Sequence, residues 1–405
     1  MNEFPSGLQF DEACTIIENI AQAHRLPTER IGLSRTHARV LAQDLVASMA
    51  LPPFDNSAMD GYALRHADVA AAGMTGLRLI GEQFAGRLLS LAIGMGECVR
   101  ITTGAPLPSG ADTVVIKEAV RVDGARVFIG GELRPGAHIR RAGEDVRAGD
   151  VVLSRGDVMT PPRVAMASSL GRAQLEVSQR PTVAVFTTGD ELIEPGLPLQ
   201  PGEIYNSNRE LLMGLLRADG LEPTAWPTLP DNPEIITSML RDAASSFDVV
   251  ITCGAVSAGE KDYIPALIQQ HGRVHFWKVR MKPGMPFLFG RLDRAQFLGL
   301  PGNPVSVLAT YLTLGRTLLD GLQGRAEPRT SWHARMASGF DKRHARREFL
   351  RGRLLPDVDG TLRVAPNPAD GSHRLAAAAQ SDALIVLPEG ERMFNAGDVV
   401  QVLPY

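Results

Sequence analysis

The sequence has few cysteines, few aromatic residues and no long apolar run. Its three cysteines, Cys14, Cys98 and Cys253, lie far apart, so they match neither a zinc-ligand spacing nor a disulfide framework. No apolar stretch is long enough to cross a bilayer. The acidic residues Glu3, Asp11 and Glu12 near the start are not typical of a secretory signal. We therefore expect a protein of the reducing cytoplasm that has no membrane partner.

The sequence also has little net charge. A formal charge of −3 over 405 residues gives no general attraction to nucleic acid or to an anionic membrane. We therefore expect no nucleic-acid partner, and any anion-binding site must be local. A hydrophobic content of 44% and a charged content of 21% are typical of globular proteins, and the length predicts about two to four domains.

Three loops that contain glycine directly follow short apolar runs. They comprise residues 187–191, 252–262 and 300–304. Glycine lets the backbone approach a ligand closely and turn its N–H groups toward an anion. One such loop would be interpreted as an ordinary turn. Three of them within one domain length predict a binding site at the carboxyl edge of a parallel sheet.

Residues 181–330 alternate between strand and helix patterns, as in a right-handed α/β unit. Asn303 is an expected N-cap and Pro304 suits the first helical position. The free N–H groups of that helix would lie near Gly302 and favour a phosphate or oxyanion. The expected strands are 182–186 and 247–251, the expected extended stretch is 275–281, and the expected helices are 208–218, 233–244 and 304–319.

The remaining sequence predicts three further regions. Residues 1–50 and 143–180 form a helical, linking N-terminal domain, residues 51–142 a β-rich inserted domain, and residues 331–405 a small C-terminal β domain. Within the first region we expect helices at 8–24, at 38–45 and at 161–178 from the apolar spacing. The predicted fold class is therefore a multidomain α/β plus β protein.

Two polar segments outside the α/β unit leave alternatives open. The loop 52–63 contains Asp55, Asn56, Ser57 and Asp60, which suit either a solvated turn or a binding loop anchored by apolar residues. The basic run 342–351 suits either a solvated strand face or a face that reaches a phosphate.

Taken in order, six motifs resemble those of the MoeA family of molybdopterin molybdenumtransferases, which is related to the E domains of gephyrin and of its plant counterpart. They are Asp55-Asn56-Ser57-Ala58-Met59-Asp60-Gly61-Tyr62-Ala63, Thr103-Gly104-Ala105-Pro106, Gly143-Glu144-Asp145, Thr188-Gly189-Asp190-Glu191, Lys282-Pro283-Gly284 and Pro301-Gly302-Asn303-Pro304. The resemblance covers essentially the whole chain. It implies a central MogA-like α/β domain with a mixed, mainly parallel sheet and a C-terminal domain resembling a β-barrel.

The resemblance also implies an activity. Molybdate would be inserted into the dithiolene of adenylylated molybdopterin, with Mg²⁺ present and AMP released. The enzyme would be a homodimer whose clefts are each built from both subunits. Further implied partners are a molybdopterin adenylyltransferase and proteins that accept the finished cofactor.

The resemblance assigns sixteen site residues. The implied catalytic residues are Asp60, Thr103, Asp145, Glu191, Asp231 and Asp262, of which Glu191, Asp231 and Asp262 would bind the metal. The implied substrate-binding residues are Gly254, Ser257, Gly259, Lys278, Lys282, Pro301, Gly302, Asn303, Arg351 and Ser372. Carboxylates suit a cleft for a polyanion when a divalent cation bridges them to phosphates.

Lys278 and Lys282 are four residues apart, so in a straight strand both would lie on one face and could meet one oxyanion. Asp231 could instead start a helix, and Asp262 could cap the helix near residue 263. The chain departs from the family pattern at Ala255, where a second glycine is usual, and at Met285, where a second lysine is common.

Two other functions remain open from the sequence. The sibling class that adenylylates molybdopterin with ATP shares the α/β unit, but the additional domains here argue against it. A non-enzymatic scaffold, which gephyrin is in part, is disfavoured because no long, proline-rich recruitment linker is present.

Overall fold

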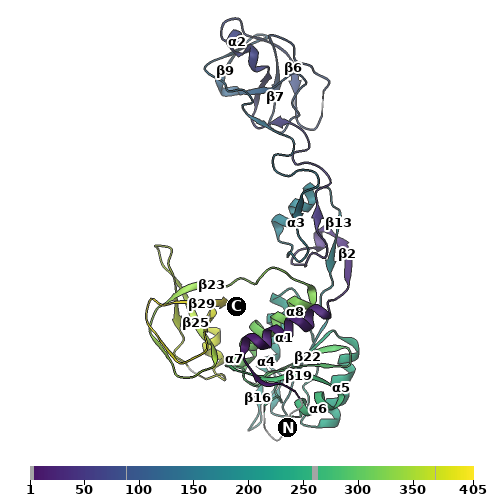
Figure 1. Ribbon diagram of the computed structural model, residues 1–405, viewed down its shortest axis with the longest axis vertical. Coiled ribbons are helices and arrows are strands. Elements are labelled where there is room, and N and C mark those ends of the chain that lie inside the picture. Colours follow the sequence, from purple (N-terminus) through teal and green to yellow (C-terminus); the bar gives the residue numbers. More distant parts are fainter. Residues whose placement is uncertain (1–3, 88, 258–262, 370) are drawn as a thin grey trace.

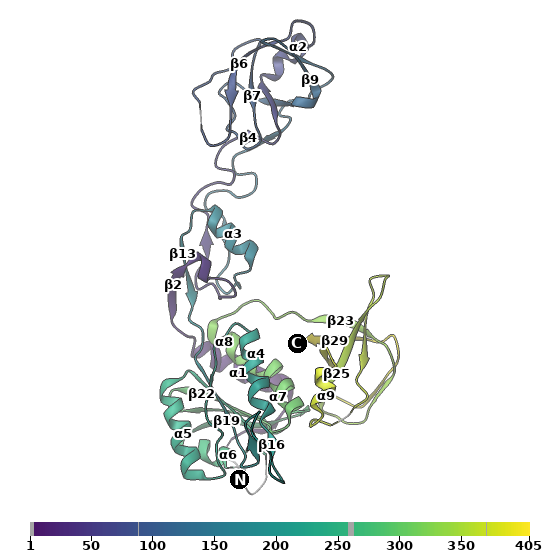
Figure 2. The same cartoon turned by 180° about the vertical axis from the view of Figure 1, so that it is seen from behind.

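The computed structural model describes residues 4–87, 89–257, 263–369 and 371–405. The chain is elongated (Figure 1), with a small β-rich portion at one end and the largest portion at the other. The view from behind shows the same arrangement (Figure 2). We name four parts by their residues, which are the α/β unit (6–23 and 183–323), the middle unit (28–46 and 151–178), the distal β unit (56–140) and the barrel (332–404).

The α/β unit is built on a seven-stranded sheet. Its strands are β1 (Ser6–Leu8), β14 (Val183–Thr187), β17 (Thr224–Ala225), β18 (Val249–Cys253), β19 (Gly272–Val279), β21 (Leu288–Leu292) and β22 (Ala295–Leu300). The order is β1-β19-β21-β22-β18-β14-β17. Strands β17, β14, β18 and β22 run parallel, and β21 runs antiparallel to both of its neighbours. The predicted mixed, mainly parallel sheet is confirmed.

Helices cover both faces of this sheet, because its central strands are apolar on both sides. Val183 and Val185 face one core, whereas Ala184 and Phe186 face the other. One face is covered by α5 (Pro233–Ser246) and α6 (Ile264–His271), and the other by α1 (Phe10–Ala23), α4 (Ser207–Ala218), α7 (Pro304–Thr310), the π-helical turn η4 (Tyr311–Gly315) and α8 (Arg316–Gln323). None of the helices in the described residues is long and apolar enough to span a membrane.

The predicted helix at the N-terminus is confirmed as α1, but its packing differs from the predicted grouping. Phe10, Ala13, Ile17 and Ala21 are buried in the core of the α/β unit. Residues 31–47 pack instead with 146–177 in a separate core. The first helix therefore packs in a different core from residues 146–177, and the predicted domain boundaries remain a prediction.

The second predicted helix, at 38–45, is wrong. Ala38 has a left-handed backbone with a φ of 58°, which does not propagate a helix. Val40 and Leu41 form β-bridges with Val158 and Val177, and β3 begins at Leu45. Tertiary strand pairing therefore overrides an apolar spacing that also suits a helix.

The middle unit combines two short strand pairs with one helix. It contains β2 (Thr28–Gly32) paired with β13 (Gln174–Ser178), β3 (Leu45–Val46) paired with β12 (Val151–Leu153), the 3₁₀ turn η1 (Leu33–Arg35) and α3 (Pro161–Ser169). The helix predicted over 161–178 ends at Ser169, because Gly171 has a positive φ of 73° and the chain then enters β13.

The distal β unit is a six-stranded sheet in the order β8-β5-β7-β6-β10-β9. Its elements are β5 (Gly61–Leu64), β6 (Leu77–Gln83), β7 (Glu97–Ile101), β8 (Thr113–Ile116), β9 (Val120–Asp123), β10 (Arg126–Ile129), α2 (Val69–Thr75) and the 3₁₀ turns η2 (His66–Asp68) and η3 (Lys117–Ala119). The pair β4 (Asn56–Ser57) and β11 (Ile139–Arg140) lies where the chain enters and leaves this unit. The prediction that this region is β-rich is confirmed.

The C-terminal unit is a closed barrel of five strands. They are β23 (Trp332–Met336), β25 (Arg347–Pro356), β26 (Leu362–Pro366), β27 (Ala383–Leu387) and β29 (Val399–Pro404). The ring closes because β25 pairs with both β26 and β27. The short elements β24 (Phe340–Lys342), β28 (Arg392–Phe394) and α9 (Leu375–Ala379) complete it. The predicted barrel-like domain is confirmed.

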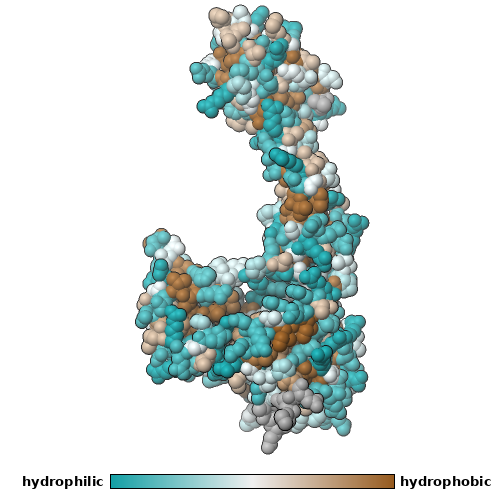
Figure 3. All heavy atoms as spheres, in the orientation of Figure 1, coloured by the Kyte–Doolittle hydropathy of each residue, from teal (hydrophilic) through white to brown (hydrophobic). Residues whose placement is uncertain are grey.

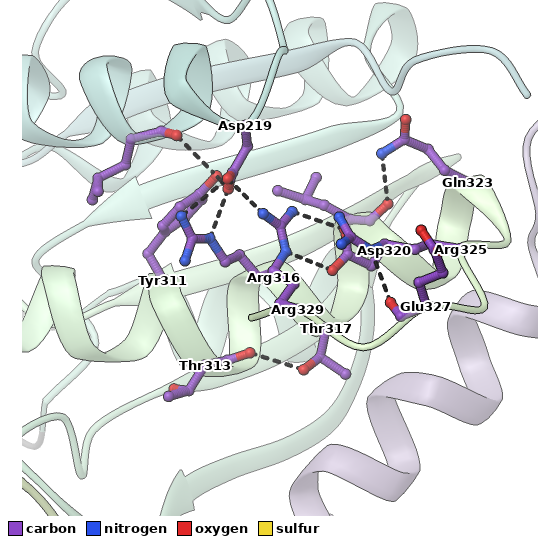
Figure 4. Close-up of polar contacts among 12 residues, drawn as sticks. Asp219, Tyr311, Thr313, Arg316, Thr317, Asp320, Gln323, Arg325, Glu327 and Arg329 are labelled. Carbon is purple, nitrogen blue, oxygen red and sulfur yellow. Dashed lines mark hydrogen bonds and ion pairs between the residues drawn. The ribbon is translucent and has the colours of Figure 1, made fainter. Parts of the chain in front are cut away.

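A charge network fixes the segment that joins α8 to the barrel (Figure 4). The Asp219 carboxylate accepts hydrogen bonds from Tyr311 Oη at 2.6 Å, Arg316 Nε at 2.8 Å and Arg329 Nη1 at 2.6 Å. Arg329 Nε also pairs with Asp320 Oδ2 at 2.7 Å. Because the Asp219 side chain is only 4% exposed, this network anchors the joining segment from inside the protein.

Candidate functional site at the sheet edge and the barrel

The three glycine-containing loops meet at the carboxyl edge of the sheet, as predicted. The Thr188 N–H donates to the Cys253 carbonyl at 3.1 Å, and the Gly254 N–H donates to the Leu300 carbonyl at 2.9 Å. Gly254 has a φ of 102°, and a Cβ atom there would overlap the Thr188 hydroxyl. This position therefore requires glycine.

Asn208 is a residue of this edge that the sequence interpretation missed. Its Nδ2 donates to the Gly302 carbonyl at 2.6 Å, and Gly302 also lies against the Gly254 backbone. The amide thus ties the first turn of α4 to the loop after β22. An Asn-Ser-Asn run at a helix start is typical of a cap, and Asn206 does cap α4, so the second asparagine carried no separate signal.

Ala255 adopts a left-handed backbone with a φ of 53°, at the position where the family usually has glycine. A left-handed residue other than glycine costs about 1–2 kcal/mol. The chain therefore tolerates strain in this loop in place of changing its shape.

We expect Ala255→Gly to raise the free energy of unfolding by roughly 0.5–1 kcal/mol, since relief of strain exceeds the added entropy of the unfolded chain. The measurement is denaturant unfolding of both proteins. The matched control is Ala71→Gly at an exposed position of α2. Glycine inside a helix should lower the free energy of unfolding there by about 1 kcal/mol. A loss of stability at position 255 similar to that at position 71 would contradict the strain argument.

Two of the predicted metal-binding carboxylates lie in loops at this edge. The Asp231 N–H donates to Asp190 Oδ1 at 3.1 Å, and the Glu191 carboxylate lies beside Gly189. The cap of α5 is Asn232, whose Oδ1 accepts from the Glu234 and Ile235 N–H groups. Asp231-Asn232-Pro233 is therefore a helix start, as the alternative interpretation expected, with Asn232 as the cap.

Two further predicted residues, Gly259 and Asp262, lie outside the described residues. Ser257, next to that segment, is exposed. Within the described ranges, no three His, Cys, Asp or Glu side chains are grouped so that they could hold a metal ion.

A cavity of about 450 Å³ lies between the α/β unit and the barrel. It brings together five predicted substrate-binding residues from both units, which are Lys282, Pro301, Asn303, Arg351 and Ser372. The loop 301–303 therefore connects the sheet edge, through Gly302, with this cavity.

Asn303 and Ser372 join the two units across the cavity. Asn303 Nδ2 donates to Ser372 Oγ at 2.9 Å, and the Val305 N–H donates to the Ser372 carbonyl at 3.1 Å. Asn303 occupies the N-cap position of α7, but its side chain makes no capping bond. The expectation of a free helix terminus near Gly302 is thus corrected, since the barrel accepts one of its N–H groups.

Arg351 was predicted to contact substrate. In the structure its guanidinium binds backbone carbonyls of the barrel. The residue is 4% exposed and donates to the carbonyls of Ala369 and Gly371. It lines the cavity while holding the backbone that leads to Ser372.

Lys278 and Lys282 do not share one straight strand face, so that prediction is wrong. Lys278 has a φ of 69°, and the strand is interrupted at Arg280 between β19 and β20 (Met281–Lys282). The Lys278 ammonium lies 4.2 Å from the Trp277 ring centroid, and Trp277 Nε1 donates to the Val256 carbonyl at 2.8 Å. Lys278 thus stays beside the 254–257 loop, whereas Lys282 lines the cavity.

The basic run 342–351 has no single role. Lys342 is buried and donates to the carbonyls of His344 and Gly390, while Arg347 pairs with Asp11 of α1 and with Glu389. Arg346 lines the cavity. The charged residues among the described lining residues are therefore three cations, Lys282, Arg346 and Arg351, and one carboxylate, Glu348.

Asp60 and Thr103 lie together in the distal β unit. Asp60 Oδ1 accepts from the Thr103 N–H at 2.9 Å and from its hydroxyl at 3.0 Å. The Thr103 backbone N–H, more than the hydroxyl and Lys117, holds the pKa of Asp60 below its ordinary value. This unit lies at the far end of the chain from the α/β unit (Figure 1), so one chain does not bring Asp60 to the cavity.

Asp145 belongs to neither group. It is exposed in the connection between the middle and distal β units, where its backbone N–H donates to the Leu51 carbonyl at 3.1 Å. The sixteen predicted residues are thus divided among the sheet edge, the cavity, the distal β unit and the connection, apart from those outside the described residues.

Comparison with known proteins accounts for nearly the whole chain. Residues 8–171 match the MoeA N-terminal region (domain I and II), residues 184–321 a probable molybdopterin binding domain, and residues 333–405 the MoeA C-terminal region (domain IV). The matched regions define a multidomain protein of molybdopterin metabolism. The chain belongs to the MoeA family of molybdopterin molybdenumtransferases, which is a class of enzymes.

Individual relatives agree with this assignment. A molybdopterin molybdenumtransferase of Haemophilus influenzae is 39% identical over 381 residues, covering 93% of this chain and 94% of that protein. One from Nostoc is 35% identical and covers 93% and 88%, respectively. A crystal structure of the molybdopterin biosynthesis MoeA protein from Pyrococcus horikoshii superposes with a TM-score of 0.83 at 28% identity, over 98% of this chain and 100% of that chain.

Proposed function

We propose that this protein inserts molybdate into the dithiolene of adenylylated molybdopterin and releases AMP. The observation that carries the proposal is the cavity between the α/β unit and the barrel, whose described lining residues include three cations and one carboxylate. Molybdate is a dianion and the pterin nucleotide is polyanionic. A local positive site in a chain of net charge −3 suits both substrates.

The cavity residues suggest how the oxyanion is held. Lys282 and Arg346 supply positive charge, and the Ser372 hydroxyl supplies a hydrogen-bond group fixed by Asn303. Gly254, Ser257 and Gly302 would hold the nucleotide part at the sheet edge, next to Lys278. The loop 301–303 joins the two parts, so one elongated substrate could contact both.

Magnesium fits the donor chemistry of the sheet edge, where Glu191 and Asp231 offer carboxylates, and the family resemblance adds Asp262, which lies outside the described residues. Mg²⁺ in phosphate-binding sites is usually held by one or two carboxylates together with substrate phosphates and water. When bound, the ion would neutralise phosphate charge. The chain itself would contribute the negatively charged carboxylates that lie beside the Mg²⁺ ion.

A homodimer would supply what one chain lacks. Asp60, Thr103 and Asp145 lie away from the cavity of their own chain, and we propose that they complete the cleft of a second copy. Val46 and Val151, register partners in the middle unit, are 41% and 55% exposed, and apolar surface is visible on this unit (Figure 3). Exposed apolar patches favour association. The apolar face of α1 is not available for such a contact, since it is buried within its own chain.

The proposed setting is the cytoplasm, with a molybdopterin adenylyltransferase as supplier and cofactor-dependent enzymes as recipients. Both are proposals from the family.

We expect purified protein to release AMP from adenylylated molybdopterin when Mg²⁺ and molybdate are both supplied. Omission of either ion should reduce the rate. Mg²⁺ would neutralise the phosphate charge, and molybdate is the group that is inserted. The measurement is AMP by chromatography together with molybdenum bound to pterin. Consumption of ATP would indicate the adenylyltransferase instead, and absence of any turnover would favour a scaffold.

A further inference from the structure

Glu348 is the single carboxylate among the described residues that line the cavity, and it is almost fully buried. Its side chain is 3% exposed, and its Oε1 lies 3.0 Å from Lys282 Nζ. The two residues are register partners in the parallel pairing of β20 with β25. A strand of the barrel therefore places a carboxylate directly beside the lysine that the α/β unit brings to the cavity.

The second carboxylate oxygen of Glu348 is held by His344. Nε2 of His344 lies 3.0 Å from Glu348 Oε2, whereas Nδ1 is buried without a hydrogen-bond partner. A neutral imidazole with its proton on Nε2 satisfies this arrangement, because a proton on Nδ1 would be a buried donor without an acceptor. Burial lowers the pKa of His344, against the opposing charge of Glu348.

The turn that carries His344 is itself fixed. The Lys342 ammonium donates to the carbonyls of His344 at 2.6 Å and of Gly390 at 2.7 Å. The groups that face Glu348 are thus Lys282 from β20, Lys342 from β24 and His344 from the turn before β25. With both its oxygens engaged, the carboxylate has one defined position.

We propose that Glu348, held by His344, is a positioning residue that fixes the Lys282 ammonium for molybdate binding in the cavity. The inference rests on the proposed function, in which Lys282 contacts an oxyanion. A lysine side chain has four rotatable bonds and makes point-charge contacts, so its usefulness at a small anion depends on being held in place. The Glu348 carboxylate, on the barrel strand that pairs with β20, holds the Lys282 ammonium in place.

A purely structural role is the competing explanation. Glu348 could serve only to attach the barrel to the α/β unit, as Arg347 does through Asp11. The two explanations differ in one respect. Both roles act through Lys282, which Glu348 contacts in the α/β unit, but a positioning role changes the affinity for molybdate, whereas a structural role lowers the free energy of unfolding and leaves that affinity unchanged.

The experiment is a double-mutant cycle of Glu348→Gln and Lys282→Met. We expect Glu348→Gln to raise the KM for molybdate in AMP release about tenfold with a smaller change in kcat. In the Lys282→Met background, Glu348→Gln should not change the KM for molybdate further. Equilibrium dialysis of molybdate against the four proteins, with molybdenum measured by mass spectrometry, provides a binding readout without turnover.

Glu389→Gln is the matched control, because Glu389 is a barrel carboxylate that pairs with Arg347 away from the cavity lining. It should leave the KM for molybdate unchanged. If Glu348→Gln fails to fold, as judged by circular dichroism, His344→Phe replaces it in the same cycle. Additive effects in the cycle, or an equal change in KM from Glu389→Gln, would overturn the positioning role. Failure of the wild-type protein to release AMP would overturn the proposed function instead, and the dialysis cycle would still test the inference.

Discussion

Mixing two impaired variants, Asp60→Asn and Lys282→Met, is expected to restore AMP release that neither shows alone. Each variant should lose on the order of a hundredfold in rate, as is typical for removal of one positioned electrostatic contact. Asp60 lies in the distal β unit and Lys282 in the cavity, at opposite ends of the elongated chain (Figure 1). If a cleft takes one residue from each subunit, a mixed dimer contains one intact cleft.

The expected size of the rescue follows from random pairing. Half of the dimers are mixed and each has one intact cleft of two, so activity should return to about a quarter of the wild-type rate. The measurement is AMP release after the two chains are mixed and allowed to exchange subunits, with exchange verified by differently tagged chains.

The matched control mixes Asp60→Asn with Thr103→Ala. Thr103 hydrogen-bonds to Asp60 within the same distal β unit, so every cleft of a mixed dimer contains one altered residue. No rescue is expected from this pair. Rescue in the control, or none in the first mixture despite verified exchange, would refute a cleft shared in this way.

The central strands were predictable because their signal is local. Each is a run of apolar residues that is buried on both faces, as in Val249–Cys253, and a glycine loop follows directly. The meeting of the three loops also followed from the sequence, because parallel strands place their carboxyl ends at one edge. Neither inference needed long-range information.

The errors arose where distant pairing decides the local structure. The spacing of Ala38, Leu41 and Leu45 suits a helix, but Leu41 pairs with Val177, far away in the chain. Similarly, α1 has an apolar face that could pack against several partners, and only the fold shows that it packs against α8 and the sheet. Periodicity shows that a face is buried and does not show which surface covers it.

The sequence indicated several residues that lie together in the structure, but it did not indicate which contacts they make. Lys282, Asn303 and Ser372 do meet in one cavity. The position of Lys278 depended on one left-handed residue, which the sequence does not mark because lysine rarely adopts it. Glu348 had no signal, because a glutamate inside a basic run is typical of a solvated strand, whereas here it is buried beside Lys282.

Asp219→Ala is expected to lower the free energy of unfolding by about 3–5 kcal/mol, as is typical when one partner of a buried ion pair is removed. The substitution would leave Arg316 and Arg329 without the carboxylate that both contact, and the Tyr311 hydroxyl without its acceptor (Figure 4). Denaturant unfolding of both proteins measures the change. Arg241→Ala is the control, since Arg241 of α5 forms an exposed pair with Asp293 at 3.5 Å and the loss of that pair should cost about 0–1 kcal/mol.

The pH dependence of the free energy of unfolding provides a second test of this prediction. Burial alone would raise the pKa of Asp219, but the hydrogen bond from Arg316 and the charge of Arg329 outweigh it and hold the pKa below its ordinary value of 3.8. A lowered pKa in the folded state means that the contribution of Asp219 is present above pH 3.8 and is lost as the pH falls through the folded value. The stability difference between wild type and Asp219→Ala should therefore be constant near neutral pH and narrow in strong acid. A difference below 1 kcal/mol at neutral pH, equal to that of Arg241→Ala, would show that the segment joining α8 to the barrel does not depend on this network.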